Sequence, residues 1–197
     1  MNPRIIIVLF ALSLASVTCK NPFARVEKVI IIQPFEDFTS DQAELIYRQI
    51  RRLDSNTVLR ESMPLPEMAY YPARERYRAD SLIRYLRRLA NNDTIVIGLT
   101  NRDISTTKGE VQDWGIMGLG YTPGQACVVS TFRLSASDRD GQLYKVAVHE
   151  LGHTLGLKHC KDPTCIMRDE EGGNHLDEEK GFCTNCTRVL RDKGWKL

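Results

Sequence analysis

The chain has 197 residues, of which 42% are hydrophobic and 26% are charged, and its formal net charge at pH 7 is +2. This length suits one domain behind a short leader, and we expect a monomer. The nearly balanced charge excludes the strongly basic surface that nucleic-acid binding proteins carry, so we expect no nucleic-acid partner.

The N-terminus has the pattern of a signal peptide over residues 1–18, because Arg4 precedes an apolar run of eleven residues and then small and polar ones. Eleven apolar residues are too few to cross a bilayer of about 30 Å as a helix. We therefore expect an exported protein whose mature domain covers residues 19–197. It would be periplasmic, held at the cell surface as a lipoprotein, or secreted. Cys19 is a candidate for a lipid anchor, although the residues before it fit a lipobox poorly. The alternative is a short buried segment.

Strands and helices are predicted to alternate along the mature domain. Runs of β-branched and apolar residues predict strands at residues 29–33, 57–60, 94–99 and 126–134. Apolar stripes with helical spacing predict helices over 39–53, where Thr39 and Gln42 form a capping box, and over 74–89. Prolines and glycines predict loops at 63–72 and 115–124. This order indicates an α/β (α+β) fold, with a twisted mixed sheet packed on helices.

Residues 149–159 are the most informative segment, since they read HExxHxxGxxH. His149 and His153 are four residues apart, so on a helix they lie on one face, about 6 Å apart along the axis, and can bind one metal ion. Glu150 is rotated by about 100° from His149, close enough to hydrogen-bond a metal-bound water without being a ligand.

His159 can join this site only if the helix ends before it. On a continuous helix it would lie about 15 Å from His149, whereas a zinc–nitrogen bond is about 2.0–2.1 Å long. Gly156 is placed to end the helix, because glycine accepts the left-handed conformation found at helix ends. The alternative, an ordinary amphipathic helix, is disfavoured because three of the four histidines fall within these eleven residues.

The motif predicts hydrolysis of peptide bonds by a zinc-activated water. Three neutral imidazoles leave a position for water, whose pKa falls towards about 7 on zinc. Glu150 is expected to take the proton as general base and to return it to the leaving amine.

Four cysteines after the motif predict a second, structural zinc. Cys160, Cys165, Cys183 and Cys186 read C-x4-C-x17-C-x2-C, close to the two-pair spacing of a closed tetrahedral site. The cofactors expected are therefore two Zn²⁺ ions, one catalytic and one structural. Two disulfides are the alternative, since an exported protein meets oxidising surroundings. Cys127 is expected to be a buried core residue.

These motifs together resemble the archaemetzincin branch of the metzincin zinc peptidases. The resemblance is carried by HExxHxxGxxH followed at once by Cys160, by the CIM triplet at residues 165–167 and by the CxxC at residues 183–186. Looser similarity in residues 100–104 and 128–134 extends it to most of the mature domain.

The resemblance implies a zincin-like or metzincin-like single domain, with HExxH on the active-site helix and a Cys-rich C-terminal segment that binds the second zinc. It places Met167 in a turn beneath the catalytic zinc. It also implies a peptide or protein substrate that pairs with an edge strand, which we expect between residues 115 and 129.

Two other functions remain open from the residues. One is a thermolysin-type HExxH peptidase, in which Glu170 or Glu171 would be the third ligand in place of His159. The other is a non-catalytic, zinc-stabilised surface protein that binds peptides without cutting them.

Overall fold

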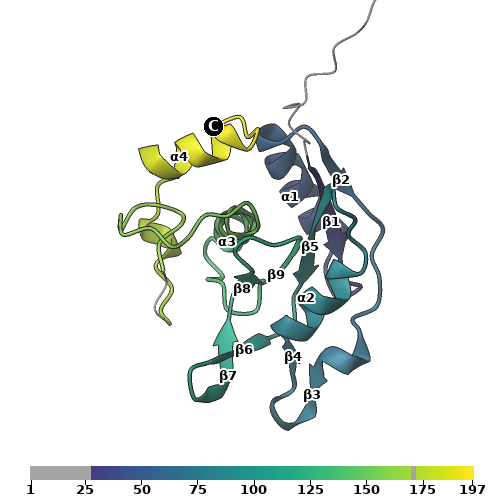
Figure 1. Cartoon of the computed structure of the whole chain (residues 1–197). Coiled ribbons are helices and arrows are strands. Elements are labelled where there is room, and N and C mark those ends of the chain that lie inside the picture. Colours follow the sequence, from purple (N-terminus) through teal and green to yellow (C-terminus); the bar gives the residue numbers. More distant parts are fainter. Residues whose placement is uncertain (1–27, 170–171) are drawn as a thin grey trace, which may run out of the picture.

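The computed structural model of the protein describes residues 28–169 and 172–197 (Figure 1). The predicted signal peptide, Cys19, Glu170 and Glu171 lie outside these ranges. In the part of the chain that is described, no helix is long and apolar enough to cross a membrane.

The larger sheet has five strands in the order β2-β1-β5-β9-β8. Its strands are β1 (Val29–Pro34), β2 (Thr57–Leu59), β5 (Thr94–Thr100), β8 (Gly118–Gly120) and β9 (Ala126–Ser130). Four of them pair in parallel, and β8 alone runs antiparallel, along β9 at the edge. This mixed sheet confirms the predicted fold class, and β8 is the edge strand expected between residues 115 and 129.

Helices cover both faces of this sheet (Figure 1). They are α1 (Ser40–Leu53), α2 (Ala79–Arg87), α3 (Arg139–Thr154) and α4 (Thr184–Asp192). Because side chains alternate along a strand, Ile30 and Ile32 join the core shared with α1 and α3, whereas Ile31 joins the core shared with α2. Single turns of 3₁₀ helix lie at Glu67–Ala69, Pro72–Arg74 and Leu176–Glu178.

A second sheet, of order β3-β4-β6-β7, was not predicted. It consists of β3 (Tyr70–Tyr71), β4 (Arg76–Arg78), β6 (Ile104–Lys108) and β7 (Val111–Ile116). The helix predicted over residues 74–89 is therefore wrong in its first turn and begins at Ala79. Ion pairs explain the difference, because Arg76 reaches Asp103 at 2.6 Å and Asp113 at 3.0 Å, which holds β4 on the sheet.

Other boundaries follow local hydrogen bonds. Thr39 caps α1 as predicted, since its hydroxyl accepts the Gln42 amide at 3.3 Å. The strand predicted over 126–134 ends at Ser130, because the chain turns there: the Ser130 hydroxyl accepts the Phe132 amide, and the Leu134 amide bonds to Thr131. The loops predicted at 63–72 and 115–124 contain β3 and β8.

Candidate catalytic site and metal centres

Helix α3 carries His149, Glu150 and His153 and ends where the sequence predicts. Gly156 has φ = 100°, the Gly156 amide donates to His153 O at 2.9 Å, and the Leu157 amide donates to Gly152 O at 3.0 Å. This pair of bonds is a Schellman motif, which ends a helix with a left-handed residue. The chain then folds back, and His159 reaches the two helical histidines.

Each of the three imidazoles has its Nδ1 bonded to an oxygen that only accepts. His149 Nδ1 donates to Ile166 O at 2.6 Å and His153 Nδ1 donates to Leu157 O at 2.8 Å. His159 Nδ1 lies 3.1 Å from an Asp169 carboxylate oxygen. Each Nδ1 therefore carries a proton, so that Nε2 is the nitrogen left to bind a metal.

The Nε2 lone pairs converge at the spacing of a metal site. His153 Nε2 and His159 Nε2 are 3.2 Å apart, and one ligand atom from each of the three histidines lies within 4.8 Å of the others. Two unprotonated nitrogens repel each other at that distance, whereas two nitrogens on a tetrahedral zinc lie about 3.3 Å apart. The three residues therefore fit a zinc ion.

Burial keeps the helical histidines neutral, as metal binding requires. Removal from water lowers the pKa of His149 to about 3, with the neighbouring His153 adding to the effect, and it also lowers the pKa of His153. His159 lies at the surface.

Glu150 is buried beside the histidines, under the edge strand β8. Loss of water raises the pKa of its carboxyl to about 8, and Oε2 has no hydrogen-bond partner in the described structure. A β-carbon on Gly118 would lie 2.5 Å from Oε1, and one on Gly120 would lie 2.7 Å from the Glu150 carbonyl oxygen. Only glycines let β8 approach this carboxylate so closely.

Met167 packs against the active-site helix. It is fully buried, and a β-carbon on Gly152, one turn along from His149, would lie 2.6 Å from its sulfur. The adjacent Ile166 supplies the oxygen that His149 binds. The turn at residues 165–167 thus supports the helix and orients one imidazole.

The four cysteines of the C-terminal segment form a second cluster, with all Sγ atoms within 4.8 Å of one another. Cys160 Sγ and Cys183 Sγ are 3.7 Å apart. Two sulfurs on a tetrahedral zinc, with bonds of about 2.3 Å, lie about 3.8 Å apart, so the set fits zinc. Cys127 is separate and fully buried in β9, as expected.

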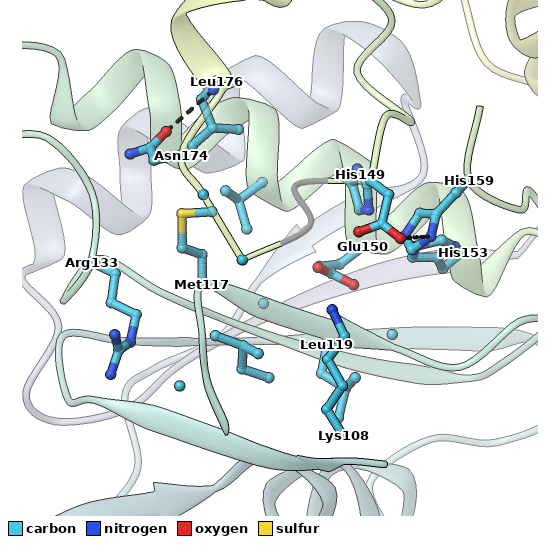
Figure 2. A pocket seen from close by; sticks show the side chains of 18 of the residues that line it. Lys108, Met117, Leu119, Arg133, His149, Glu150, His153, His159, Asn174 and Leu176 are labelled. Carbon is cyan, nitrogen blue, oxygen red and sulfur yellow. Dashed lines mark hydrogen bonds and ion pairs between the residues drawn. The ribbon is translucent and has the colours of Figure 1, made fainter. Parts of the chain in front are cut away.

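A cleft of about 730 Å³ contains the histidines and Glu150 at one end (Figure 2). Strand β8 forms one side, and Arg133 and Asn174 lie towards the other end. The sequence motifs identified none of Lys108, Met117, Arg133, Asp169 or Asn174, because these come from separate turns and from the unpredicted second sheet. One feature of the sequence could have pointed to Asp169 as a residue of the site: it follows Met167 by two residues.

Comparison with known proteins agrees with this geometry. The model of peptidase family M54 matches residues 16–192. An archaemetzincin of Natronomonas pharaonis is 31% identical over 150 residues, which cover 70% of this chain and 84% of that one. An archaemetzincin of Methanopyrus kandleri is 35% identical over 140 residues, covering 68% and 77%.

Solved structures agree as well. The crystal structure of the Methanopyrus kandleri archaemetzincin has a TM-score of 0.72 at 27% identity, covering 85% of this chain and 96% of that one. That of Archaeoglobus fulgidus archaemetzincin, complexed with malonate, has a TM-score of 0.69 at 27% identity, covering 81% and 98%. The chain therefore belongs to the archaemetzincins, peptidase family M54, and is a zinc-dependent metallopeptidase.

Proposed function

We propose that His149, His153 and His159 hold the catalytic zinc of this peptidase and that Glu150 is its general base. The observation that carries the proposal is the approach of His153 Nε2 and His159 Nε2 to 3.2 Å, while the Nδ1 atom of each ring faces an oxygen acceptor. The same observation favours His159 over Glu170 or Glu171 as third ligand.

The three histidines would hold a zinc that, when bound, would supply a Lewis acid for the peptide carbonyl and for an attacking water. Glu150 takes the proton of that water as it attacks, because its buried carboxylate is basic and has an open oxygen. It then donates the proton to the amine that leaves. Burial serves both steps, since a pKa near neutrality suits a group that must accept and then release a proton.

The substrate is proposed to bind as an extended strand along β8. One edge of β8 pairs with β9, and the strand lines the cleft beside Glu150. An extended peptide added there would gain main-chain hydrogen bonds. The glycines of β8 leave room for the peptide and for the carboxylate.

A second, structural zinc is proposed at Cys160, Cys165, Cys183 and Cys186. The sulfur spacing supports zinc over two disulfides, whose sulfurs would be about 2.05 Å apart. Thiol titration under non-reducing conditions tests this: chelation should release four reactive thiols per chain, and release of none would indicate disulfides.

We also propose that the protein is exported and that Cys19 is the site of a lipid anchor, on the pattern of the first nineteen residues. The mature protein is proposed to be a monomer. Mass spectrometry of the mature N-terminus tests the export and the anchor. An unmodified N-terminus before or after Cys19 would contradict the anchor.

The catalytic proposal is tested with Glu150→Gln and wild-type protein, digesting a broad peptide library and counting zinc on the same samples. We expect the variant to keep its zinc and to lose cleavage by several orders of magnitude. His153→Ala should instead lose the catalytic metal. Full activity in Glu150→Gln would refute the assignment.

A further inference from the structure

One cation of the cleft is held in a fixed orientation away from the zinc ligands. Arg133 lies in the turn after β9, lines the cleft, and its side chain is 33% exposed. Its Nε and Nη2 each bond to an oxygen of the buried Asp103 at 2.9 Å. Nη1 has no hydrogen-bond or ion-pair partner in residues 28–169 and 172–197.

The second sheet builds the seat of this guanidinium. A β-carbon on Gly115, in β7, would overlap the Arg133 guanidinium, so the absence of a side chain there makes its space. Asp103 is shared with Arg76, at 2.6 Å, and therefore does not fully neutralise Arg133. The ion-pair network around Arg133 has one positive charge in excess, because four guanidinium groups face three carboxylates. The guanidinium groups are those of Arg74, Arg76, Arg78 and Arg133, and the carboxylates are those of Asp80, Asp103 and Asp113.

Arg133 is within reach of a peptide bound at the catalytic end. Gly115 contacts the guanidinium and Gly118 contacts the Glu150 carboxylate. The three residues of chain from one to the other span at most about 10 Å. The cleft is also lined by the apolar side chains of Met117, Val146 and Leu176. In Figure 2, Met117 lies between Arg133 and Glu150.

We infer that Arg133 is a specificity-determining residue that binds a carboxylate of the substrate peptide, within about three residues of the scissile bond. The apolar side chains that line the cleft contact the aliphatic part of the substrate residue that carries the carboxylate. Arg133 Nη1 donates a charge-assisted hydrogen bond to that carboxylate. The carboxylate belongs to an acidic side chain or to the C-terminus of a short peptide. This inference rests on the proposed function.

The test uses the zinc-loaded full chain and quenched fluorescent peptides designed from a sequence selected by library digestion. In one set of pairs, Glu or Gln is placed at each position up to three residues from the scissile bond. In a second set, the same peptide is made with a free C-terminal acid or with a C-terminal amide. The paired peptides differ by one charge and hardly in shape, so their kcat/KM ratio reports carboxylate recognition.

We expect one position to favour Glu over Gln, or the free acid over the amide, by about 10- to 100-fold, and the pair that responds identifies the source of the carboxylate. Arg133→Gln should reduce that ratio to about one, whereas Lys108→Gln, which removes another cation of the cleft, should preserve it. The wild-type ratio is a test even if Arg133→Gln does not fold.

If the wild-type enzyme gave kcat/KM ratios within about twofold of one for the Glu and Gln peptides at every position, and for the acid and amide forms, this inference alone would be overturned. An Arg133→Gln protein that keeps the wild-type ratio would also overturn it. An absence of any cleavage by wild-type protein would overturn the proposed function, and this inference with it.

Discussion

Adding one methyl group to β8 should move the catalytic base without unfolding the protein. In Gly118→Ala, the new β-carbon would lie 2.5 Å from Glu150 Oε1 and 2.7 Å from its Cγ. An ordinary carbon–oxygen contact is about 3.3–3.6 Å, so the carboxylate must retreat by about 1 Å. Displacement of a reacting group by that distance costs about 10²-fold in rate. We therefore expect kcat/KM to fall by about 10- to 100-fold.

Stability should change little in Gly118→Ala, for two reasons. The atoms in close contact all belong to one side chain, that of Glu150, and none is backbone, and Gly118 is not among the residues with positive φ. Gly98→Ala is a matched control, because its β-carbon would lie 2.6 Å from a Leu86 methyl group in the core, remote from the cleft. It should lower the free energy of unfolding by about 1–3 kcal/mol and leave activity per folded molecule unchanged.

The assay combines peptide cleavage, zinc counting and thermal unfolding on each variant. Activity of Gly118→Ala within about twofold of wild type, with full zinc content, would refute the idea that β8 positions Glu150. Loss of zinc would refute it too, because the change would then act through the histidines.

Three further results are expected. Asp169→Ala removes the acceptor of His159 Nδ1 and should weaken zinc binding by about 10- to 100-fold in competition with a chelator. Cys183→Ser should lose the second zinc and, through the loosened His159, part of the activity; unchanged turnover would contradict that coupling. In zinc-free protein, His149 should cost stability as pH falls from about 6.5 towards 3, because with a folded pKa of about 3 it takes up its proton mainly when unfolded. The buried Glu150 carboxyl, whose pKa is raised to about 8, acts in the opposite direction above about pH 4.5, so the free energy of unfolding of wild type relative to His149→Gln, and not the wild-type profile alone, should fall over that range.

The candidate site could be predicted from the sequence largely because it is local. Helix periodicity places His149 and His153 on one face, and the left-handed preference of glycine places the turn at Gly156. The cysteine spacing likewise brings four thiols together. Such signals depend on neighbours in the chain, which a single sequence records directly.

The second sheet depends on contacts that no local pattern records. Residues 74–78 have helical composition, yet Arg76 and Arg78 lie in a strand, because they form ion pairs with Asp103 and Asp113. These aspartates come at least 27 residues later in the chain, so no local pattern records the pairing. Tertiary ion pairs and strand pairing thus outweigh propensity. The same distance in sequence hides Arg133 as a cleft residue, since its seat is built from β7 and from Asp103.

The C-terminal segment links the two candidate metal sites through the oxygen atoms that bind the histidines. All three acceptors follow the helix: Leu157, Ile166 and Asp169. Ile166 is next to Cys165, and Asp169 follows a residue that pairs with Cys160 through a backbone bridge. A zinc held by the cysteines would therefore fix two of the three acceptors, and with them the directions of the Nε2 lone pairs at the catalytic site. Because metal affinity depends on such partners, a zinc at the cysteines would act on catalysis without touching the substrate.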